Sequence, residues 1–392
     1  MKPIMDDHQL SELITAADLP PADTDAAIAE LGAASVAEAL LSEIWARTRL
    51  LPEPIAKTTV QLDLGFDNER LHYLFTLGAG TCEVEPGRAP RPPAIYRQDL
   101  SELLRAVFSP GRHDATRELV IADSTEPHGL AADDPWLRQR RSAVLAAHQL
   151  VEAISRRFTD LTELAVRFDA DKWGGHWYTP HYQHYLEPLR DRRVKVLEIG
   201  VGGYNDPNLG GASLRMWKHY FWRGRIYGLD IHPKTGITEP RLQTVQGDQG
   251  DAEFLAGFAR EHGPFDVVID DGSHFSEHVL TSFAQLFPHV RPGGRYIIED
   301  TQSSYWPGWG GSTDLDSTTT SMGFVKKLLD GLNHQEQIRP ADRAPSATEL
   351  TVTGVHVHHN VVVLDKGVNT EQGPPSWIPR TEDPRLWYAG ES

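Results

Sequence analysis

The chain has 392 residues, more than one hydrophobic core usually accommodates, so two domains are expected. Its composition, 40% hydrophobic and 24% charged, is that of a globular protein, and no run of about 18 apolar residues offers a membrane span. The net charge of -17 repels phosphate backbones and anionic lipids, which argues against nucleic acid and membrane as partners. Cys82 is the only cysteine, so no internal disulfide or thiolate metal cluster is possible. The first residues do not have the pattern of a signal peptide, and we expect a cytoplasmic protein.

Residues 1–150 predict a mixed α+β domain that carries no recognisable catalytic motif. Apolar residues recur with helical spacing over 34–49, 100–107 and 136–168. They alternate with polar residues over 59–64 and 71–75, which predicts a hairpin that turns at Asp67 and Asn68. Closely spaced prolines mark 86–93 as a loop.

From Val194 onward, short apolar runs alternate with helical stretches, and the runs read VKVLEIG, RIYGLD, RLQTVQGD, FDVVIDD and GRYIIED. This order is typical of a doubly wound, mostly parallel sheet of the Rossmann-like class, whose ligands bind at the carboxyl ends of the strands. The runs VTGVHVHH and NVVVLDKG predict an antiparallel hairpin at one edge. We therefore assign residues 151–392 to a second, α/β domain.

A glycine-rich turn, Glu198-Ile-Gly200-Val-Gly202-Gly, ends the first of these strands. Glycines there let the backbone approach a ligand closely. A dinucleotide fingerprint that begins at Gly200 requires a third glycine where Asn205 stands, so a nicotinamide cofactor is disfavoured.

The next two strands end in polar groups that suit a nucleoside. Asp230 follows the second strand, where an acid can accept hydrogen bonds from ribose hydroxyls. Asp248 and Gln249 follow the third, well placed to border an adenine ring. Together with the glycine turn, this order resembles the nucleoside-binding half of class I S-adenosylmethionine-dependent methyltransferases. In the alternative, the glycines form only a tight turn and Asp230 only caps a helix.

Acidic pairs end the fourth and fifth strands: Asp270-Asp271 and Glu299-Asp300. Neighbouring strand ends bring these carboxylates together, which is costly unless a cation joins them. Hard oxygen ligands suit Mg²⁺, and we assign Asp271, Glu299 and Asp300 as its ligands and Asp270 to the cofactor side. In the alternative, Glu299 and Asp300 are solvated loop acids.

His274, three residues beyond Asp271, is the candidate general base for methylation of an oxygen. Coordination of two vicinal hydroxyls to the metal would lower the pKa of the one that is methylated. Two alternatives remain for His274. It can bind zinc together with His278, four residues later, or it can have a structural role.

Two further segments are candidates for shaping the pocket. The aromatic stretch from Lys172 to Tyr185, with Tyr178 and Thr179, precedes the first parallel strand and can cover the cofactor. In the alternative, its aromatic side chains fill a core, as aromatics more often do. The Gly- and Ser-rich run over 301–321 follows Asp300 directly, and a loop of that length beside a site is often a lid.

The motifs GGHWYTPHY, VLEIGVGGY, YGLDIHP, VIDDGSHFSEH and GRYIIEDTQ resemble the sugar O-methyltransferases of macrolide and related polyketide biosynthesis, the mycinamicin VI and demethylmacrocin 2-O-methyltransferase type. Rhamnosyl O-methyltransferases look similar too. The resemblance is strong over 171–302 and implies S-adenosylmethionine, Mg²⁺, a base at His274 and metal ligands at Asp271, Glu299 and Asp300. It also implies a homotetramer, an auxiliary N-terminal domain and a glycosylated polyketide substrate methylated on a deoxysugar hydroxyl, the 2-OH or a neighbour.

Two other functional classes compete with a methyltransferase. One is a hydroxylase or oxidoreductase of natural-product biosynthesis on the same fold, which the missing third glycine disfavours. The other is a noncatalytic binding protein, which the intact set of acids and histidine disfavours.

Overall fold

The structure, a computed structural model, describes residues 5–52, 54, 56–78, 81–111, 116–121, 134–338, 343–373 and 375. Its contacts divide the chain into two units. The N-terminal unit comprises Met1–Arg193, Ala212–Arg225 and Gly236–Gln243, and the C-terminal unit comprises Val194–Gly211, Ile226–Thr235 and Thr244–Ser392. The domain boundary that the sequence predicts between residues 150 and 151 stays a prediction.

A five-stranded sheet in the order β3-β2-β1-β4-β5 forms the centre of the N-terminal unit. The predicted hairpin is confirmed, because β1 pairs antiparallel with β2 and Asp67 turns the chain at φ 53°. Sequence analysis did not predict the other three strands. The strands are β1 (Thr58–Phe66), β2 (Glu69–Gly78), β3 (Thr81–Pro86), β4 (Ala94–Asp99) and β5 (Arg117–Ile121).

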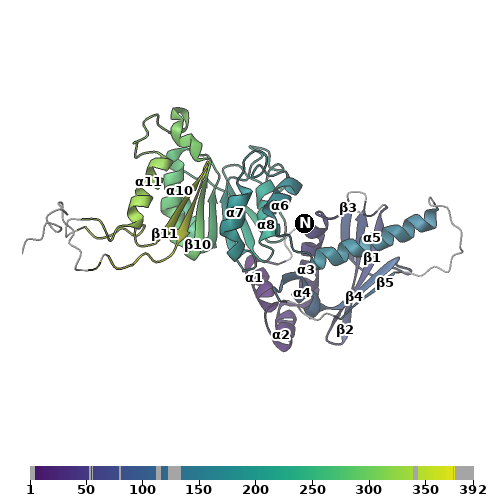
Figure 1. Ribbon diagram of the computed structural model, residues 1–392. Helices are drawn as coiled ribbons and strands as arrows, with labels where there is room; N and C mark the ends of the chain where they lie inside the picture. Colours follow the sequence, from purple (N-terminus) through teal and green to yellow (C-terminus); the bar gives the residue numbers. More distant parts are fainter. Residues whose placement is uncertain are drawn as a thin grey trace, which may run out of the picture. The chain divides into compact units, whose positions relative to one another are not determined.

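Helix α5 crosses this sheet and packs on β1 and β4 (Figure 1). The single helical pattern predicted over 136–168 is interrupted at Arg156, which is extended, and a new helix begins after Asp160, whose carboxylate accepts from the backbone N–H groups of Thr162 and Glu163. Among the described residues, no helix is both long and apolar enough to cross a bilayer. The helices of this unit are α1 (Asp7–Ala16), α2 (Pro21–Leu31), α3 (Ala33–Thr48), α4 (Leu100–Phe108), α5 (Pro135–Ser155), α6 (Leu161–Phe168), α7 (Thr179–Leu186), the 3₁₀ helix η1 (Glu187–Leu189) and α8 (Ala212–Tyr220).

A buried ion cluster joins distant segments of the N-terminal unit. Glu43 on α3 accepts hydrogen bonds from Arg47 Nε at 2.9 Å and from Arg241 Nη2 at 2.7 Å. Lys218 on α8 donates to Glu239 Oε2 at 3.0 Å. All five side chains are buried, so each charge depends on its partner.

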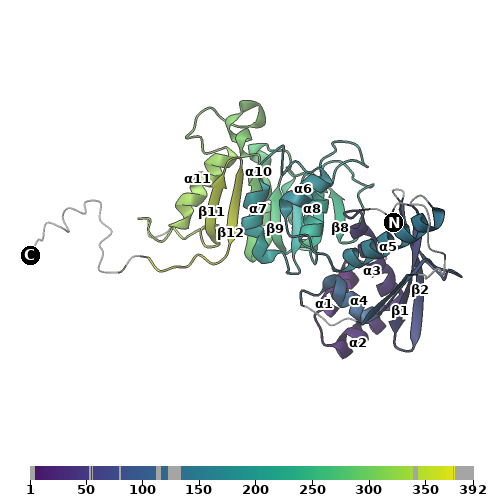
Figure 2. The ribbon, with the colours of Figure 1, turned by 45° about the vertical axis from the view of Figure 1, so that its right-hand side comes forward.

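The five predicted strands and the predicted edge hairpin together form the seven-stranded sheet in the order β11-β12-β10-β9-β6-β7-β8 (Figures 1 and 2). β9 pairs in parallel with both β6 and β10, whereas β12 runs antiparallel to β10 and β11, which confirms the edge hairpin. The strands are β6 (Lys195–Ile199), β7 (Arg225–Asp230), β8 (Leu242–Gln246), β9 (Phe265–Asp270), β10 (Val290–Glu299), β11 (Val352–His358) and β12 (Val361–Lys366).

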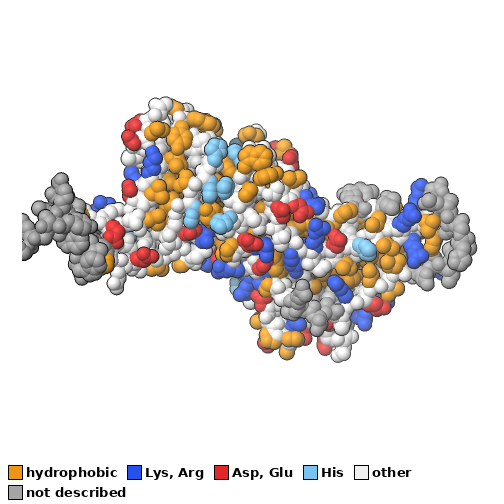
Figure 3. Space-filling view, in the orientation of Figure 1, with side chains coloured by type: hydrophobic (Ala, Val, Ile, Leu, Met, Phe, Trp, Pro, Cys, Tyr) orange, Lys and Arg blue, Asp and Glu red, His pale blue; other side chains and the backbone are white. Residues whose placement is uncertain are grey.

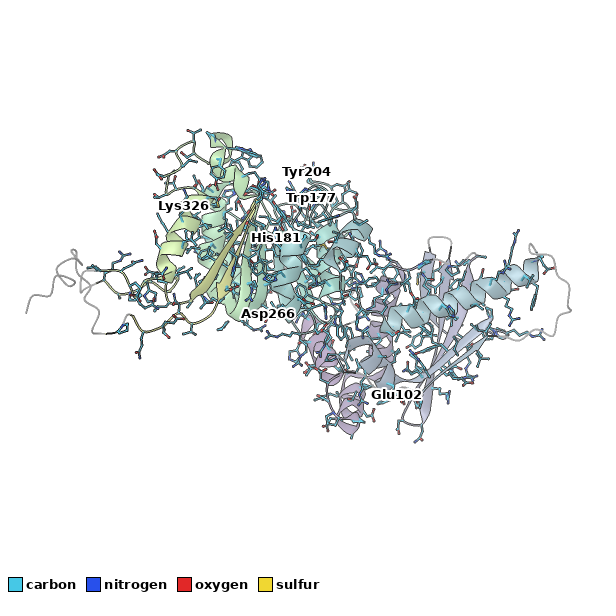
Figure 4. The ribbon with its side chains drawn as sticks, in the orientation of Figure 1. Glu102, Trp177, His181, Tyr204, Asp266 and Lys326 are labelled. Atoms are coloured by element: carbon cyan, nitrogen blue, oxygen red, sulfur yellow. The ribbon has the colours of Figure 1, made fainter. Side chains whose placement is uncertain are left out.

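The core of the C-terminal unit lies between the sheet and the apolar faces of its helices, with Leu197, Leu255, Phe283 and Val325 among its buried members. Tyr204 follows β6 and Asp266 lies near the start of β9, and Figure 4 shows them at opposite ends of the unit. The carboxyl ends of the parallel strands therefore share the Tyr204 end. The helices are α9 (Ala252–His262), α10 (Ser276–Leu286), α11 (Ser321–Leu332) and the 3₁₀ helices η2 (Phe287–His289), η3 (Thr301–Tyr305) and η4 (Pro307–Trp309).

Candidate active site

The glycine turn after β6 brings the end of that strand against the end of β9. Gly200 donates to the carbonyl of Leu229 at 2.7 Å, and Asp271 N donates to the carbonyl of Ile199 at 3.0 Å. Gly200 has φ +92°, and a Cβ on it would collide with the carbonyl oxygen of Asp271. Gly202 also has a left-handed backbone, at φ +72°. Glycine is therefore required at 200 to seat Asp271, while contact of Gly200 and Gly202 with a cofactor stays a prediction.

Asp230 holds the glycine turn in place. Its Oδ2 accepts from Val201 N at 3.0 Å, and its Oδ1 accepts from His232 N at 2.8 Å. The predicted ribose acid thus lies directly beside the turn, at the end of β7. Contact with a ribose stays a prediction.

Lys234 is a second support that sequence analysis did not identify. Its Nζ donates to the carbonyl oxygens of Tyr204 at 2.5 Å, Asp206 at 3.2 Å and Leu209 at 3.4 Å. Lys234 is only 3% exposed. Its buried ammonium group therefore stabilises the loop after the glycines by donating to three of its carbonyl groups.

Gln249 and Asp270 form a buried hydrogen-bond network behind the strand ends. Gln249 Nε2 donates to Asp270 Oδ1 at 2.6 Å, and Gln249 Oε1 accepts from Ser273 N at 2.9 Å. Ser282 Oγ also donates to Asp270. Burial raises the pKa of Asp270 to about 6, and the hydrogen bond from Ser282 partly opposes the rise. The network fixes the backbone of Ser273, next to His274.

Asp248 is exposed and directly precedes Gln249 in the chain. Its Oδ1 accepts from Gly250 N at 2.7 Å. Gln249 and Asp270 already use their polar atoms within the protein. For Asp248, Gln249 and Asp270 alike, contact with the nucleoside stays a prediction.

The structure brings four carboxylates together at the ends of β6, β9 and β10, and we call Glu198, Asp271, Glu299 and Asp300 the carboxylate cluster. Ligand atoms of Glu198, Asp271 and Glu299 lie within 4.8 Å of one another. Those of Asp271, His274 and Asp300 do so as well. Asp271 belongs to both groups and links them. Glu198 and Glu299 are buried, which makes a concentration of negative charge there expensive without a cation.

His274 faces the exposed side of the carboxylate cluster. Its Nε2 lies 3.5 Å from Asp300 Oδ2. His274 and Asp300 both have left-handed backbones, at φ 59° and 52°, a conformation that non-glycine residues adopt rarely. His278 has a different partner, because its Nδ1 lies 2.8 Å from Ser273 Oγ. The two histidines are thus directed to different groups, which disfavours a shared zinc ion.

An aromatic side chain of the predicted lid, residues 301–321, lies near His274. The Trp309 ring lies 6.3 Å from the His274 ring and 5.4 Å from the Phe275 ring. Phe275, Tyr305, Trp306 and Trp309 are each at least 40% exposed. Hydrophobic side chains also gather on the surface of the lobe that carries α10 and α11 (Figure 3). We call Phe275, Tyr305, Trp306 and Trp309 the aromatic surface.

Hydrogen bonds at both ends hold the lid segment. Thr301 N donates to the carbonyl of Asn360 in the β11–β12 turn at 3.2 Å. Ser304 Oγ and Ser321 Oγ lie 2.5 Å apart, and Met322 N donates to Ser304 Oγ at 3.0 Å. The segment that carries the aromatic surface is therefore fixed to the hairpin and to the start of α11.

Tyr178 and Thr179 belong to the N-terminal unit, where both are buried. Tyr178 stacks on His176 with ring centroids 4.6 Å apart, and Thr179 Oγ1 lies 2.8 Å from Thr162 Oγ1. Their predicted contact with the cofactor stays a prediction.

Comparison with known proteins gives consistent matches over the whole chain. Residues 10–118 match the family described as MycE methyltransferase N-terminal. The chain is 43% identical to mycinamicin VI 2''-O-methyltransferase of Micromonospora griseorubida, over 88% of each chain. It is 40% identical to 8-demethyl-8-alpha-L-rhamnosyl tetracenomycin-C 2'-O-methyltransferase of Streptomyces olivaceus, over 94% of this chain and 98% of that protein.

A solved structure matches equally broadly. The MycE methyltransferase of the mycinamycin pathway, in complex with Mg, SAH and mycinamycin VI, superposes with a TM-score of 0.83 and 39% identity. The match covers 98% of this chain and 100% of that one. The N-terminal as well as the C-terminal region is therefore shared.

Proposed function

Because the chain belongs to the family of O-methyltransferases that act on the sugars of glycosylated antibiotics, we propose that it methylates the 2-OH, or a neighbouring hydroxyl, of a deoxysugar on a polyketide. It is a sugar O-methyltransferase that uses S-adenosylmethionine and Mg²⁺. The observation that carries the proposal is the carboxylate cluster with His274 beside it, at the ligand-binding end of the sheet.

The carboxylate cluster fits a magnesium ion. Its oxygen donors converge from three strand ends, and hard oxygen ligands are those that Mg²⁺ prefers. We propose Asp271, Glu299 and Asp300 as the ligands, with Glu198 close enough to Asp271 and Glu299 to take part. When bound, the ion would orient two vicinal sugar hydroxyls and lower the pKa of the reacting one.

His274 is the proposed general base. Methylation of a hydroxyl oxygen releases its proton, and His274 Nε2 is the titratable nitrogen on the exposed side of the carboxylate cluster. Asp300, 3.5 Å away, would stabilise the imidazolium that forms.

The cofactor side of the site is assigned to the glycine turn and its supports. We propose that Gly200 and Gly202 let the methionine part of the donor approach the backbone, and that Asp230 accepts from the ribose hydroxyls. Asp248 is the proposed partner on the adenine side. Glu198, Gln249, Asp270, Tyr178 and Thr179 complete the proposed binding set.

The aromatic surface is the proposed contact for the polyketide. Its rings are exposed, and one of them, Trp309, lies 6.3 Å from the ring of the proposed base. A flat apolar aglycone would bury them, while the sugar reaches His274. This arrangement supports a large glycosylated substrate over a free sugar.

Substitution of the base provides the main test. We expect His274→Gln to lower kcat by about 10²- to 10⁴-fold while calorimetric binding of S-adenosylhomocysteine is retained. His278→Gln is the matched control and should keep most activity, because His278 is bonded to Ser273. Equal losses in both variants, with loss of zinc from both, would support the zinc pair and refute the assignment. EDTA should abolish turnover, and added Mg²⁺ should restore it.

Mass spectrometry of products tests the substrate class. A panel of glycosylated polyketides with free vicinal sugar hydroxyls should gain one methyl group on the sugar. A product methylated on the aglycone would contradict the proposal. The predicted homotetramer stays a prediction, for which light scattering is the direct measurement. Membership of this family disfavours an oxidoreductase or a noncatalytic protein.

A further inference from the structure

A cavity lies in the N-terminal unit, away from any motif that the methyl transfer uses. Its volume is about 380 Å³, and four arginines line it: Arg105, Arg117, Arg157 and Arg190. We call it the arginine cavity. Glu102 on α4, labelled in Figure 4, also lines it. The chain as a whole carries a net charge of -17, so the cavity has the opposite sign of charge to the protein as a whole.

The acids of the arginine cavity already have partners. Asp191 forms a two-pronged pair with Arg190, with both N···O distances at 3.1 Å. Glu102 accepts from Thr116 N at 2.9 Å and from Thr116 Oγ1 at 3.0 Å. Within the described ranges, Arg105, Arg117 and Arg157 form no ion pair with a carboxylate. Four arginines thus line the cavity against two acids, although the charges of Glu43 and Asp191 also act on Arg157.

Arg157 is held rigidly in the wall. Its Nη2 donates to the carbonyl of Ala106 at 2.6 Å, and its guanidinium lies 4.1 Å from the centre of the Trp222 ring. Burial, followed by the charge of Arg47, lowers the pKa of Arg157 to about 9. An anion in the cavity would relieve the cost of this charge.

Arg105 is also fixed, because its Nη2 donates to Thr24 Oγ1 at 2.9 Å. Ser155 and Thr159 add hydroxyl groups to the lining. Two guanidinium groups held in place, with hydroxyl groups in the same lining, match the several oxygens of a phosphate better than a single carboxylate.

We propose that the arginine cavity binds a small phosphate ester, a site separate from the methyl-transfer chemistry. The phosphate would lie among Arg105, Arg117 and Arg157. The volume exceeds that of a phosphate ion, and Trp222 offers an apolar wall for the organic part.

The test is calorimetric titration of the full chain in a chloride buffer with saturating S-adenosylhomocysteine, which occupies the nucleoside site. Ribose 5-phosphate and inorganic phosphate are the probes, and ribose is the uncharged control. We expect both probes to bind, the ester more tightly, and ribose not to bind. Binding of ribose, of inorganic phosphate alone, or of neither probe at millimolar concentration would overturn the proposal.

Two variants locate the site. Arg105→Gln combined with Arg117→Gln should weaken ribose 5-phosphate binding by on the order of tenfold or more. Arg260→Gln, on the exposed face of α9, removes the same charge elsewhere and should bind normally. If the double variant fails to fold, Arg117→Gln alone serves, because that side chain is exposed. Unchanged affinity in the folded variants would refute the assignment.

Discussion

Replacement of Gly200 by alanine should damage stability and catalysis together. A Cβ at this position would lie well under 3.0 Å from the carbonyl oxygen of Asp271, a separation that real Cβ atoms do not tolerate. That carbonyl belongs to a residue of the carboxylate cluster, so relief of the clash must move Asp271 or the glycine turn. Gly293 is the matched control, because it too has a positive φ, at +84°, but a Cβ there meets nothing within 4 Å.

The two variants separate two costs. A left-handed alanine costs roughly 1–2 kcal/mol of unfolding free energy, and this is the whole expected effect of Gly293→Ala. Gly200→Ala adds overpacking of about 1–3 kcal/mol, for a total of about 2–5 kcal/mol. The entropy that alanine removes from the unfolded chain is common to both variants and cancels in the comparison.

Urea unfolding followed by tryptophan fluorescence measures the difference in free energy. Methyl transfer should also fall by on the order of 10²-fold in Gly200→Ala, since a shift of about 1 Å in a positioning group has that effect. Gly293→Ala should retain its turnover. Equal stability losses in the two variants, or full activity of Gly200→Ala, would refute the role given to this contact.

Three further predictions concern other parts of the molecule. Burial alone would raise the pKa of Glu239, but the charges of Lys218 and Arg215 outweigh it and lower the pKa to about 2. The free energy of unfolding should therefore fall as the pH drops from about 4.5 to 2. Urea titrations should show Glu239→Gln to be about 3 kcal/mol less stable at pH 7, and its unfolding free energy should change less with pH between 4.5 and 2. Lys234→Met should weaken S-adenosylhomocysteine binding about tenfold in calorimetry, because the loop after the glycines loses its support. Trp309→Ala should raise KM for the glycosylated polyketide about tenfold and leave KM for S-adenosylmethionine unchanged; an equal rise in both would contradict the aromatic surface.

The strand-end chemistry was predictable because it rests on local patterns and one rule of topology. Each parallel strand is a short apolar run that leads into a glycine turn or ends in a polar residue, and parallel strands end on the same side of a sheet. Asp271 and Asp300 could therefore be placed together although 29 positions separate them by their numbering. The glycine at 200 was predictable for the same reason, as a turn where the backbone must pass closely.

The supports of the site were not predictable. Lys234 reaches three carbonyl groups of a loop that precedes it by more than twenty residues, and a lone lysine gives no periodic signal. The same holds for Gln249, whose bonds to Asp270 and Ser273 depend on how the loops fold. The end of the helix at Arg156 was missed because apolar spacing continues through it, although Asp160 is a recognisable cap for the next helix.

The buried ion cluster limits how this enzyme can be divided or recombined. Glu43 and Arg241 are 198 positions apart, and Arg241 directly precedes β8. A shortened protein that starts at residue 151 would keep the arginine but lose its carboxylate, and a stranded buried cation costs about 3–5 kcal/mol. A chimera that takes only its first half from a relative has the same unpaired charge unless its residues at positions 43 and 241 still form an ion pair. New substrate preferences should therefore arise more readily through changes near the lid than through exchange of whole domains.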